Sequence, residues 1–313
     1  METAAAIIDS YQVATAQEVK QDMYDRFIAY LDATPKTVAT YAQALRRLFT
    51  YFADNGIRQP KRENLISYRE ELKAAGRKPS TISLYIVAAR LFFQWAAQEG
   101  LYPNIAEHLK GIKMDRGHKR DYLTSRQVKA VLNETDQDTI QGKRDYAILT
   151  LMVACGLRTI EVSRANIEDL RTVGDEAVIY VQGKGHEERT DFVKMPMEVE
   201  KAIRSYLKAR GTKDKTEPLF TSLSHKSEGQ RISTRAIRDI VKTKMRAAGY
   251  DSDRLSAHSL RHTAVTLSLL AGKPITEVSR FARHTNIATT MIYNHALDMA
   301  NNTCSAAIAK AIF

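Results

Sequence analysis

The chain has 313 residues, of which 44% are hydrophobic, and this is enough for one or two ordinary cores. Its 47 Lys and Arg against 36 Asp and Glu give a formal net charge of +11, which favours a polyanionic partner such as nucleic acid or an anionic membrane. The longest apolar stretch, Tyr146 to Cys155, is about half of the ~20 residues that a bilayer span needs, and METAAAIIDS lacks the features of a secretory signal. We therefore expect a cytoplasmic protein without a membrane segment.

The first part of the chain, about 16–109, reads as helices separated by turn signals. Thr34-Pro35 is typical of an N-cap followed by a first-turn proline, and Asn55-Gly56 is a stop signal. The connections are short, which predicts a small helical bundle. The four helices are expected over about 16–32, 35–55, 62–75 and 79–100.

Polar and basic residues gather at the starts of the second and fourth of these helices. Helix amino termini carry partial positive charge and free N–H groups, so donors there can hold phosphates. Ordinary capping with solvated lysines explains any single one of these residues as well. The group comprises Lys36, Thr37, Thr40 and Tyr41 on the second helix, and Arg77, Lys78, Ser80, Thr81 and Ser83 around the start of the fourth.

Residues 110–121 form a basic stretch with two glycines, which predicts an exposed linker between two domains. Such a linker could cross a DNA backbone, although a solvated hinge would have the same composition. Its cations are Lys110, Lys113, Arg116, Lys119 and Arg120.

The second segment, 122–313, mixes helical and strand patterns, so the expected fold class is α+β and mostly α, with a small antiparallel sheet. The only cysteines, Cys155 and Cys304, have no ligand-like spacing, and Cys155 is expected in the core. Helices are expected over about 125–133 and 143–155 and again from 198 to the end, with strands around 167–170, 177–181 and 190–194.

Four motifs in this segment carry groups suited to phosphoryl chemistry. In the first, GLRTIE (156–161), Arg158 can donate two N–H groups to a phosphate, and Glu161 lies one helical turn away to orient it. In the second, VQGKGHEER (181–189), a predicted hairpin presents Lys184 between two glycines. Taken alone, the first motif is also typical of a surface ion pair and the second of a mobile hairpin with a solvated lysine.

The third motif, AHSLRH (257–262), opens a predicted helix. His258 and Arg261 are three residues apart, so both can address one phosphate. Position 259 is Ser rather than the Glu of a zincin helix and no third ligand is evident, so we expect no metal and interpret His262 as a hydrogen-bonded structural histidine.

The fourth motif, RHTNIATTMIY (283–293), contains His284 and Tyr293. The chain has 14 tyrosines, so Tyr293 gains weight only from its place nine residues after His284 and downstream of the other three motifs.

In chain order, these motifs resemble the tyrosine recombinase family, the phage integrase-type enzymes that include the Xer recombinases. The segment PKTVATYAQALRRLFTYF also resembles that family's core-binding domain, so the resemblance spans nearly the whole chain. It implies DNA-binding and catalytic domains at 16–109 and 122–313, with Glu161 and His262 in supporting roles. It places the two arginines on Arg158 and Arg261, the lysine on Lys184, the histidines on His258 and His284, and the nucleophile on Tyr293.

The resemblance implies that Tyr293 forms a 3′-phosphotyrosine while Lys184 protonates the departing 5′ oxygen, without metal, ATP or another cofactor. We expect two nearby guanidiniums to lower the pKa of Tyr293, with His258 assisting its deprotonation. The family further implies that four protomers act on double-stranded DNA with paired inverted core half-sites and exchange strands through a Holliday junction.

Two features depart from the family pattern. Ala282-Arg283-His284 replaces the frequent Leu-Gly-His, which places an extra cation beside the site and favours a mobile element over a housekeeping resolver of chromosome dimers. The lead of about fifteen residues is too short for an arm-binding domain, so simple core sites are expected. A non-catalytic DNA-binding regulator, a topoisomerase and a metal-dependent nuclease are the competing interpretations.

The last segment, LDMANNTCSAAIAKAIF, carries a narrow apolar stripe at helical spacing. A short terminal helix must dock to be stable, either on its own domain or on a neighbour, and the resemblance favours docking on the next protomer. The stripe comprises Leu297, Ala300, Cys304, Ile308, Ala311 and Ile312.

Overall fold

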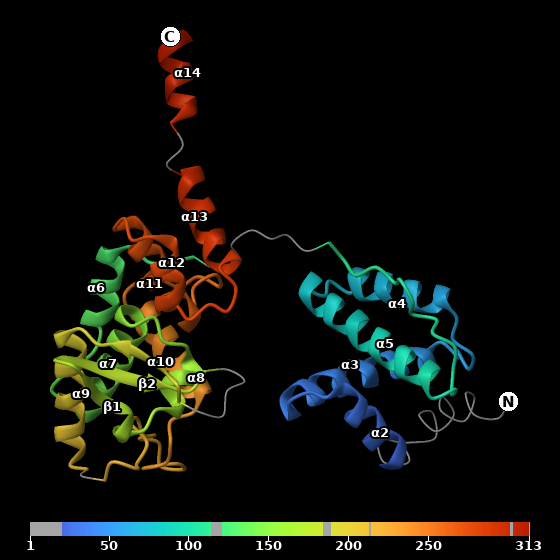
Figure 1. Cartoon of the computed structure of the whole chain (residues 1–313), viewed down its shortest axis with the longest axis horizontal. Coiled ribbons are helices and arrows are strands. Elements are labelled where there is room, and N and C mark those ends of the chain that lie inside the picture. The colour runs from blue at the N-terminus through green and yellow to red at the C-terminus, as the bar shows by residue number, and fades with distance from the viewer. Residues whose placement is uncertain (1–20, 114–120, 184–188, 213, 301–302, 313) are drawn as a thin grey trace. The chain divides into compact units, whose positions relative to one another are not determined.

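A computed structural model of the chain describes residues 21–113, 121–183, 189–212, 214–300 and 303–312 (Figure 1). The chain divides into two compact units, Met1–Arg116 and Gly117–Phe313. Helices dominate both units, and a small antiparallel sheet lies in the second, so the predicted fold class is confirmed. None of the described helices is long and apolar enough to cross a membrane.

The described part of the first unit is a bundle of helices, as predicted. Thr34 caps the second of them, because its side-chain oxygen accepts a hydrogen bond from the N–H of Thr37 at 3.4 Å, and Pro35 occupies the first turn. The helices are α2 (Gln21–Leu31), α3 (Pro35–Asp54), α4 (Arg62–Ala74) and α5 (Pro79–Gln98).

Aromatic side chains form much of the core of this unit. The rings of Phe49 and Phe92 pack edge to face at 5.1 Å, and those of Phe27 and Trp95 do so at 5.3 Å. These contacts join α2, α3 and α5.

Three arginines of the first unit bind its own backbone. Arg62, Arg69 and Arg90 donate hydrogen bonds to carbonyl oxygens of the segment Glu107 to Lys110, with 2.8 Å between Arg69 Nη1 and the Lys110 oxygen. These bonds fix the chain where it leaves the bundle, so part of the positive charge of this unit has a structural role.

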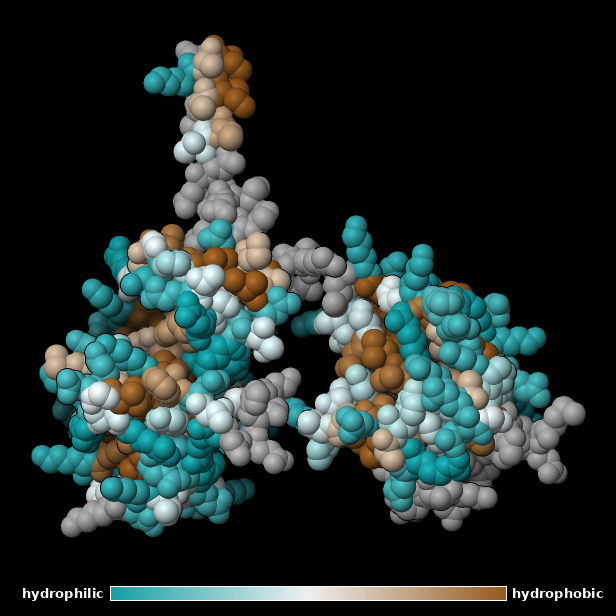
Figure 2. All heavy atoms as spheres, in the orientation of Figure 1, coloured by the Kyte–Doolittle hydropathy of each residue, from teal (hydrophilic) through white to brown (hydrophobic). Residues whose placement is uncertain are grey.

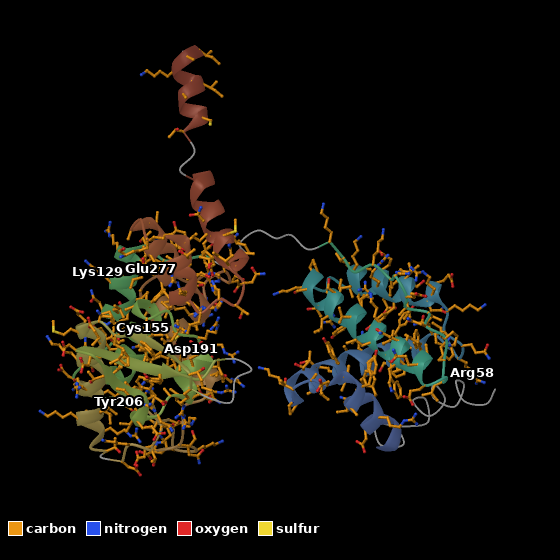
Figure 3. The ribbon with its side chains drawn as sticks, in the orientation of Figure 1. Arg58, Lys129, Cys155, Asp191, Tyr206 and Glu277 are labelled. Atoms are coloured by element: carbon orange, nitrogen blue, oxygen red, sulfur yellow. The ribbon has the colours of Figure 1, made fainter. Side chains whose placement is uncertain are left out.

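In the second unit, α7 is the central helix, and it packs against α9 and α11. It begins at Ile140 rather than at about Lys143, because the Thr139 hydroxyl accepts a hydrogen bond from the N–H of Gly142 at 3.0 Å. Cys155, which follows this helix, is fully buried, as predicted (Figure 3). The helices are α6 (Ser125–Asn133), α7 (Ile140–Ala154), α8 (Thr159–Arg164), α9 (Met197–Arg210), α10 (Thr234–Ala247), α11 (Ala257–Leu270), α12 (Ile275–Phe281), α13 (Ala288–Ala300) and α14 (Cys304–Ile312).

The sheet has the strand order β1-β2-β3, with both neighbouring pairs antiparallel. Its strands are β1 (Leu170–Val173), β2 (Glu176–Val181) and β3 (Asp191–Lys194). The prediction of a strand around 167–170 was wrong, because Ile167–Asp169 forms a 3-10 turn. The Asp169 carboxylate accepts a hydrogen bond from the Asn166 N–H at 2.7 Å and closes this turn, so the strand begins only at Leu170.

The expectation of helices from 198 to the end also needs correction. Between α9 and α10 the described chain is non-helical. The bridge Asn166↔Pro218 ties it to the backbone after α8, and the bridge Thr221↔Arg231 joins two parts of the stretch itself. This stretch contains Gly211 and Pro218, both of which oppose helix continuation.

Candidate active site

A tight turn between α7 and α8 places Arg158 at the start of α8. Gly156 in this turn has a φ of +60°, and a Cβ there would lie 3.1 Å from the ring of Phe281. Glycine is therefore favoured both by the backbone conformation and by the close approach of the neighbouring ring. Arg158 then occupies the N-cap position of α8, and 29% of its side chain is exposed.

Glu161 orients Arg158 from inside the protein. Its fully buried carboxylate accepts a hydrogen bond from the Arg158 N–H at 2.8 Å and forms an ion pair with Arg158 Nη1 at 2.7 Å. Burial alone would raise the pKa of Glu161, but the guanidiniums of Arg283 and Arg158 outweigh it and lower that pKa. Glu161 is therefore a carboxylate at neutral pH, as its predicted supporting role requires.

Arg261 joins two of the other motifs. It lies on α11, is almost fully buried, and donates hydrogen bonds to the Gly156 carbonyl at 2.6 Å and to the Ala282 carbonyl. Burial, followed by the charges of Arg158 and Arg283, lowers the pKa of Arg261 to about 9. The side chain remains a cation at neutral pH, fixed between the first motif and the residue directly before the fourth.

Three histidine rings and Tyr293 lie in succession beside these arginines. The ring centroids are 4.5 Å apart for His258 and His262, 5.0 Å for His262 and Tyr293, and 6.4 Å for His284 and Tyr293. His258 is exposed at the start of α11, whereas Tyr293 on α13 is only 6% exposed. His262 is buried between the two.

Burial and the neighbouring guanidiniums have opposite effects on the pKa of Tyr293. Burial raises the pKa of Tyr293 to about 12, and the nearby charges of Arg261 and Arg158 lower it by less than burial raises it. The guanidiniums thus act in the expected direction, but burial of the phenol, which the sequence does not reveal, has the larger effect on its pKa. Tyr293 is a neutral phenol at physiological pH.

His284 is neutral as well. Burial, followed by the charges of Arg261 and Arg158, lowers the pKa of His284 to about 4. Its Nδ1 shares a hydrogen bond of 2.8 Å with the hydroxyl of the buried Thr290, one turn before Tyr293 on α13. His284 can therefore exchange hydrogen bonds with a ligand but adds no charge at neutral pH.

The structure thus brings together, in one unit, most of the residues singled out in the sequence. Two buried or half-buried guanidiniums can stabilise charge on a phosphate, and a phenol beside them can act as a nucleophile. The assembled residues are Arg158, Glu161, His258, Arg261, His262, His284 and Tyr293.

Lys184 lies outside the described residues. The two strands that flank it pair in antiparallel register, with Val181 opposite Asp191, so the predicted hairpin is present up to its tip. Its described ends contact the end of α8 and the 3-10 turn that follows: Arg164 donates to the Gly183 carbonyl at 3.2 Å, and Arg189 pairs with Asp169 at 3.0 Å.

The residues predicted to contact DNA in the first unit differ in exposure. Lys36, Arg77, Lys78 and Ser80 are exposed, as is Lys113. The half-buried members are Thr37, Thr40, Tyr41, Thr81 and Ser83. Thr40 donates to the Lys36 carbonyl at 2.8 Å, so its hydroxyl is engaged within the helix. Arg116, Lys119 and Arg120 lie outside the described residues.

Sequence reasoning missed three features of the second unit. Arg283 was noted only as an extra cation beside the site, yet it pairs with Glu161 at 2.8 Å. Thr290 was not singled out, although the repeated Thr289-Thr290 between His284 and Tyr293 was a usable signal. The exposed basic side chains of α10, among them Arg235 and Arg238, were also overlooked.

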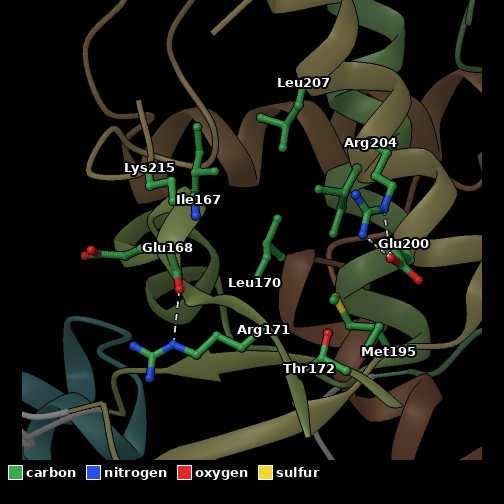
Figure 4. A pocket seen from close by; sticks show the side chains of 12 residues that line it. Ile167, Glu168, Leu170, Arg171, Thr172, Met195, Glu200, Arg204, Leu207 and Lys215 are labelled. Atoms are coloured by element: carbon green, nitrogen blue, oxygen red, sulfur yellow. Dashed lines mark hydrogen bonds and ion pairs between the residues drawn. The ribbon is translucent and has the colours of Figure 1, made fainter. Parts of the chain in front are cut away.

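Two pockets of the second unit lie away from these residues. Among the described residues, no group of three or more His, Cys, Asp or Glu side chains could hold a metal ion. A pocket of about 390 Å³ lies between the sheet and α9, where Arg204 pairs with Glu200 (Figure 4). A second, of about 700 Å³, lies beside α10, and neither pocket is lined by a residue of the four motifs.

Comparison with known proteins agrees with this arrangement. The phage integrase family model matches residues 121–299, and the model of the phage integrase N-terminal SAM-like domain matches residues 24–100. Tyrosine recombinase XerC of Haemophilus influenzae is 34% identical over 72% of this chain and 73% of its own length. A tyrosine recombinase of Synechocystis sp. is 29% identical over 83% of this chain and 86% of its own length.

The fold also matches solved structures. XerH site-specific recombinase bound to a palindromic difH substrate aligns with a TM-score of 0.70 and 18% identity over 95% of this chain and 94% of that one. The chain therefore belongs to the phage integrase family and is a tyrosine recombinase.

Proposed function

We propose that this chain recombines double-stranded DNA at specific sites and that Tyr293 is its nucleophile. The observation that carries the proposal is the position of a buried tyrosine beside two fixed guanidiniums, Arg261 and Arg158, whose charges act on its phenol. Such a pair can stabilise the charge that gathers on the non-bridging oxygens of a phosphate under attack.

The proposed reaction conserves the energy of the DNA backbone. The phenol oxygen of Tyr293 forms a bond with the phosphorus while the bond to the 5′ oxygen breaks, which yields a 3′-phosphotyrosine. Lys184 gives its proton to the departing 5′ oxygen, and the phenol proton leaves through His258. Because the covalent link replaces one phosphodiester with another, the step needs no ATP, and the arginines supply the charge that a metal would otherwise supply.

The high pKa of Tyr293 bears on how it is activated. A bound phosphate would offset the charges of Arg158 and Arg261, so the guanidiniums alone do not make a stable phenolate. The proton must therefore leave as the bond to phosphorus forms, which is general base catalysis. His258 is suited to this step because it is exposed at the start of α11 and contacts the ring of His262, which in turn contacts Tyr293.

We assign the DNA contacts to cations on both units. The bundle at 16–109 is the proposed core-binding domain, 110–121 a basic linker across the backbone, and 122–313 the catalytic domain. The exposed residues Lys36, Arg77, Lys78 and Lys113 suit phosphate contacts in the first unit and the linker, and Arg235 and Arg238 of α10 suit them in the second.

We further propose that four protomers assemble on paired inverted half-sites through the tail. Ile308 and Ile312 of α14 are 58% and 67% exposed, and Figure 2 shows hydrophobic residues along one side of this helix. An apolar stripe of this kind is suited to a groove of a neighbouring protomer. One solved neighbour of the same fold is a lambda integrase tetramer bound to a Holliday junction.

For the biological role we propose a cytoplasmic integrase or resolvase of a mobile element. The departure Ala282-Arg283-His284 from the frequent Leu-Gly-His favours this over the alternative, a housekeeping recombinase that resolves chromosome dimers.

The test is to trap the chain on DNA fragments from its own gene's locus in excess EDTA. The ends that remain attached to denatured protein are then sequenced. We expect attachment at two inverted half-sites that border a movable segment. Attachment at one fixed chromosomal site favours the housekeeping role, whereas binding without attachment indicates a non-catalytic regulator. Relaxation of DNA without two-site exchange indicates a topoisomerase, and a strict need for Mg²⁺ contradicts the chemistry.

A further inference from the structure

Arg283 stands in a backbone conformation that an arginine rarely adopts. Its φ is +51°, in the left-handed region, where a side chain beyond Cβ is disfavoured and glycine is not. The chain therefore accepts local strain at this position, and strain of this kind persists only where the surroundings hold it in place. Its side-chain contacts identify what holds it.

The guanidinium of Arg283 faces the interior of the protein. Only 9% of the side chain is exposed. Nη2 contacts Glu161 Oε2 at 2.8 Å and the Gly156 carbonyl at 3.2 Å, and Nη1 donates to the Phe281 carbonyl at 2.9 Å. These contacts link α12 and the segment after it to the turn before α8.

Arg283 acts on Arg158 indirectly through Glu161 and also directly through its own backbone carbonyl. The Arg283 carbonyl accepts a hydrogen bond from Arg158 Nη2 at 3.1 Å, while Glu161 Oε1 binds Arg158 Nη1 at 2.7 Å. Both terminal nitrogens of Arg158 are thus tied on their inner side. The guanidinium is left with fixed orientation and with further N–H groups for a ligand.

The charge balance depends on Arg283 as well. The buried carboxylate of Glu161 would otherwise be paired chiefly with Arg158 and would offset most of its charge. With Arg283 on the second carboxylate oxygen, two guanidiniums share one negative charge. The group keeps a net positive charge beside Arg261.

We propose that Arg283 is a positioning residue for strand cleavage: it engages Glu161 and Arg158 so that Arg158 keeps both its orientation and its charge for the scissile phosphate. The inference rests on the proposed recombinase function and adds to it a residue outside the six carried by the family resemblance. It also explains why an arginine can occupy a position that the backbone favours for glycine.

The test measures single-turnover formation of the covalent adduct on a half-site mapped by trapping. Arg283→Gly relieves the backbone strain and removes the ties, so we expect cleavage to slow about 10–100-fold, the scale of a small misplacement of a catalytic group. Half-site affinity should stay within about 3-fold, because the buried Arg283 side chain does not face the ligand. Arg280→Ala, which removes an exposed arginine of α12, is the matched control and should cleave at the wild-type rate.

Three further measurements separate positioning from a loss of folding. Combined with Glu161→Gln, Arg283→Gly should slow cleavage by less than about 3-fold more, because coupled residues are not additive. On a half-site whose scissile phosphate is a methylphosphonate, which lacks one negative charge, the defect should shrink. A folding defect would persist on both substrates. Arg283→Lys, which keeps the charge and some of the reach, should cleave at an intermediate rate.

Several results would overturn the proposal. Cleavage by Arg283→Gly at the wild-type rate would do so. The same holds if Arg283→Gly slows cleavage by an equal factor in the wild-type chain and in the Glu161→Gln variant. If Arg283→Gly does not fold, Arg283→Gln decides, since it keeps hydrogen bonding but not the ion pair, and normal cleavage by it contradicts the proposal. Absence of any adduct with the wild-type chain would instead overturn the recombinase function, and the inference with it.

Discussion

Arg261 and Tyr293 are both buried at the candidate site, but their surroundings act on them differently. Arg261 donates to the carbonyls of Gly156 and Ala282, so the fold itself fixes the position of its charge. Tyr293 is held by ring contacts with His262 and His284, and its pKa is raised to about 12 by burial. In the proposed mechanism, the stabilisation of phosphate charge is therefore preorganised, whereas Tyr293 must be activated as it attacks the phosphate.

Arg261→Lys should disrupt the preorganised stabilisation of phosphate charge. Among the variants that retain Tyr293, we expect it to have the largest effect on cleavage. Lysine keeps the charge but cannot reach two carbonyls with a rigid planar fork. We expect cleavage to fall about 10³-fold, near the upper end for loss of one charge-stabilising donor, with a lower melting temperature of the second unit. Adduct formation and calorimetry on the same preparation would measure both effects. Cleavage by Arg261→Lys at the wild-type rate would contradict the claim that the fixed Arg261 guanidinium stabilises the phosphate charge.

Lys184→Ala tests protonation of the leaving 5′ oxygen, a step that involves neither Arg261 nor Tyr293 directly. We expect it to slow cleavage of normal DNA about 10²–10³-fold, as loss of a general acid does. On a substrate with sulfur at the bridging 5′ position the rate should largely recover, because a thiolate leaves without a proton. Equal impairment on both substrates would rule out Lys184 as the acid.

Deletion of Ala300 to Phe313 tests whether assembly of protomers affects the helix that carries Tyr293. Tyr293 lies on α13, directly before this segment, so a tail held by a neighbour would constrain that helix. We expect single half-site binding to survive, while recombination of paired sites falls about 10-fold or more, because linked binding events lose their effective concentration. If the truncated chain recombines two sites at the full-length rate, the tail is not an assembly element.

The smallest expected effect is on stability in acid. The pKa of His284 is lowered to about 4, whereas an unfolded histidine titrates near its usual value of about 6.5. Between these values the unfolded chain binds the extra proton, so stability falls as the pH drops from about 6.5 to 4. With His284→Gln, the loss of melting temperature between pH 7 and pH 5 should shrink by about 2–4 °C. An unchanged loss would mean that His284 is not held neutral.

Local spacing was sufficient to predict much of the site. Arg158 and Glu161 are one helical turn apart, and His258 and Arg261 repeat that spacing, so their association could be predicted without the fold. The bundle and the hairpin followed from turn signals in the same way.

Contacts between distant segments could not be predicted. The ion pair of Arg283 with Glu161 joins residues that are far apart in the sequence, and it depends on a φ that the sequence does not reveal. The pKa of Tyr293 depends on burial by α11 and α12, through Val265, Val278 and Ala282. The start of β1 was misplaced because a side-chain hydrogen bond of Asp169 competes with strand pairing.

The most direct test of the account is the covalent adduct formed by Tyr293→Phe. The substitution removes one oxygen and retains the ring that packs against His262 and His284, so half-site binding should stay within about 2-fold of wild type. The account predicts that the denaturation-resistant protein–DNA adduct then disappears. An adduct of normal yield would contradict it and move the nucleophile to another residue.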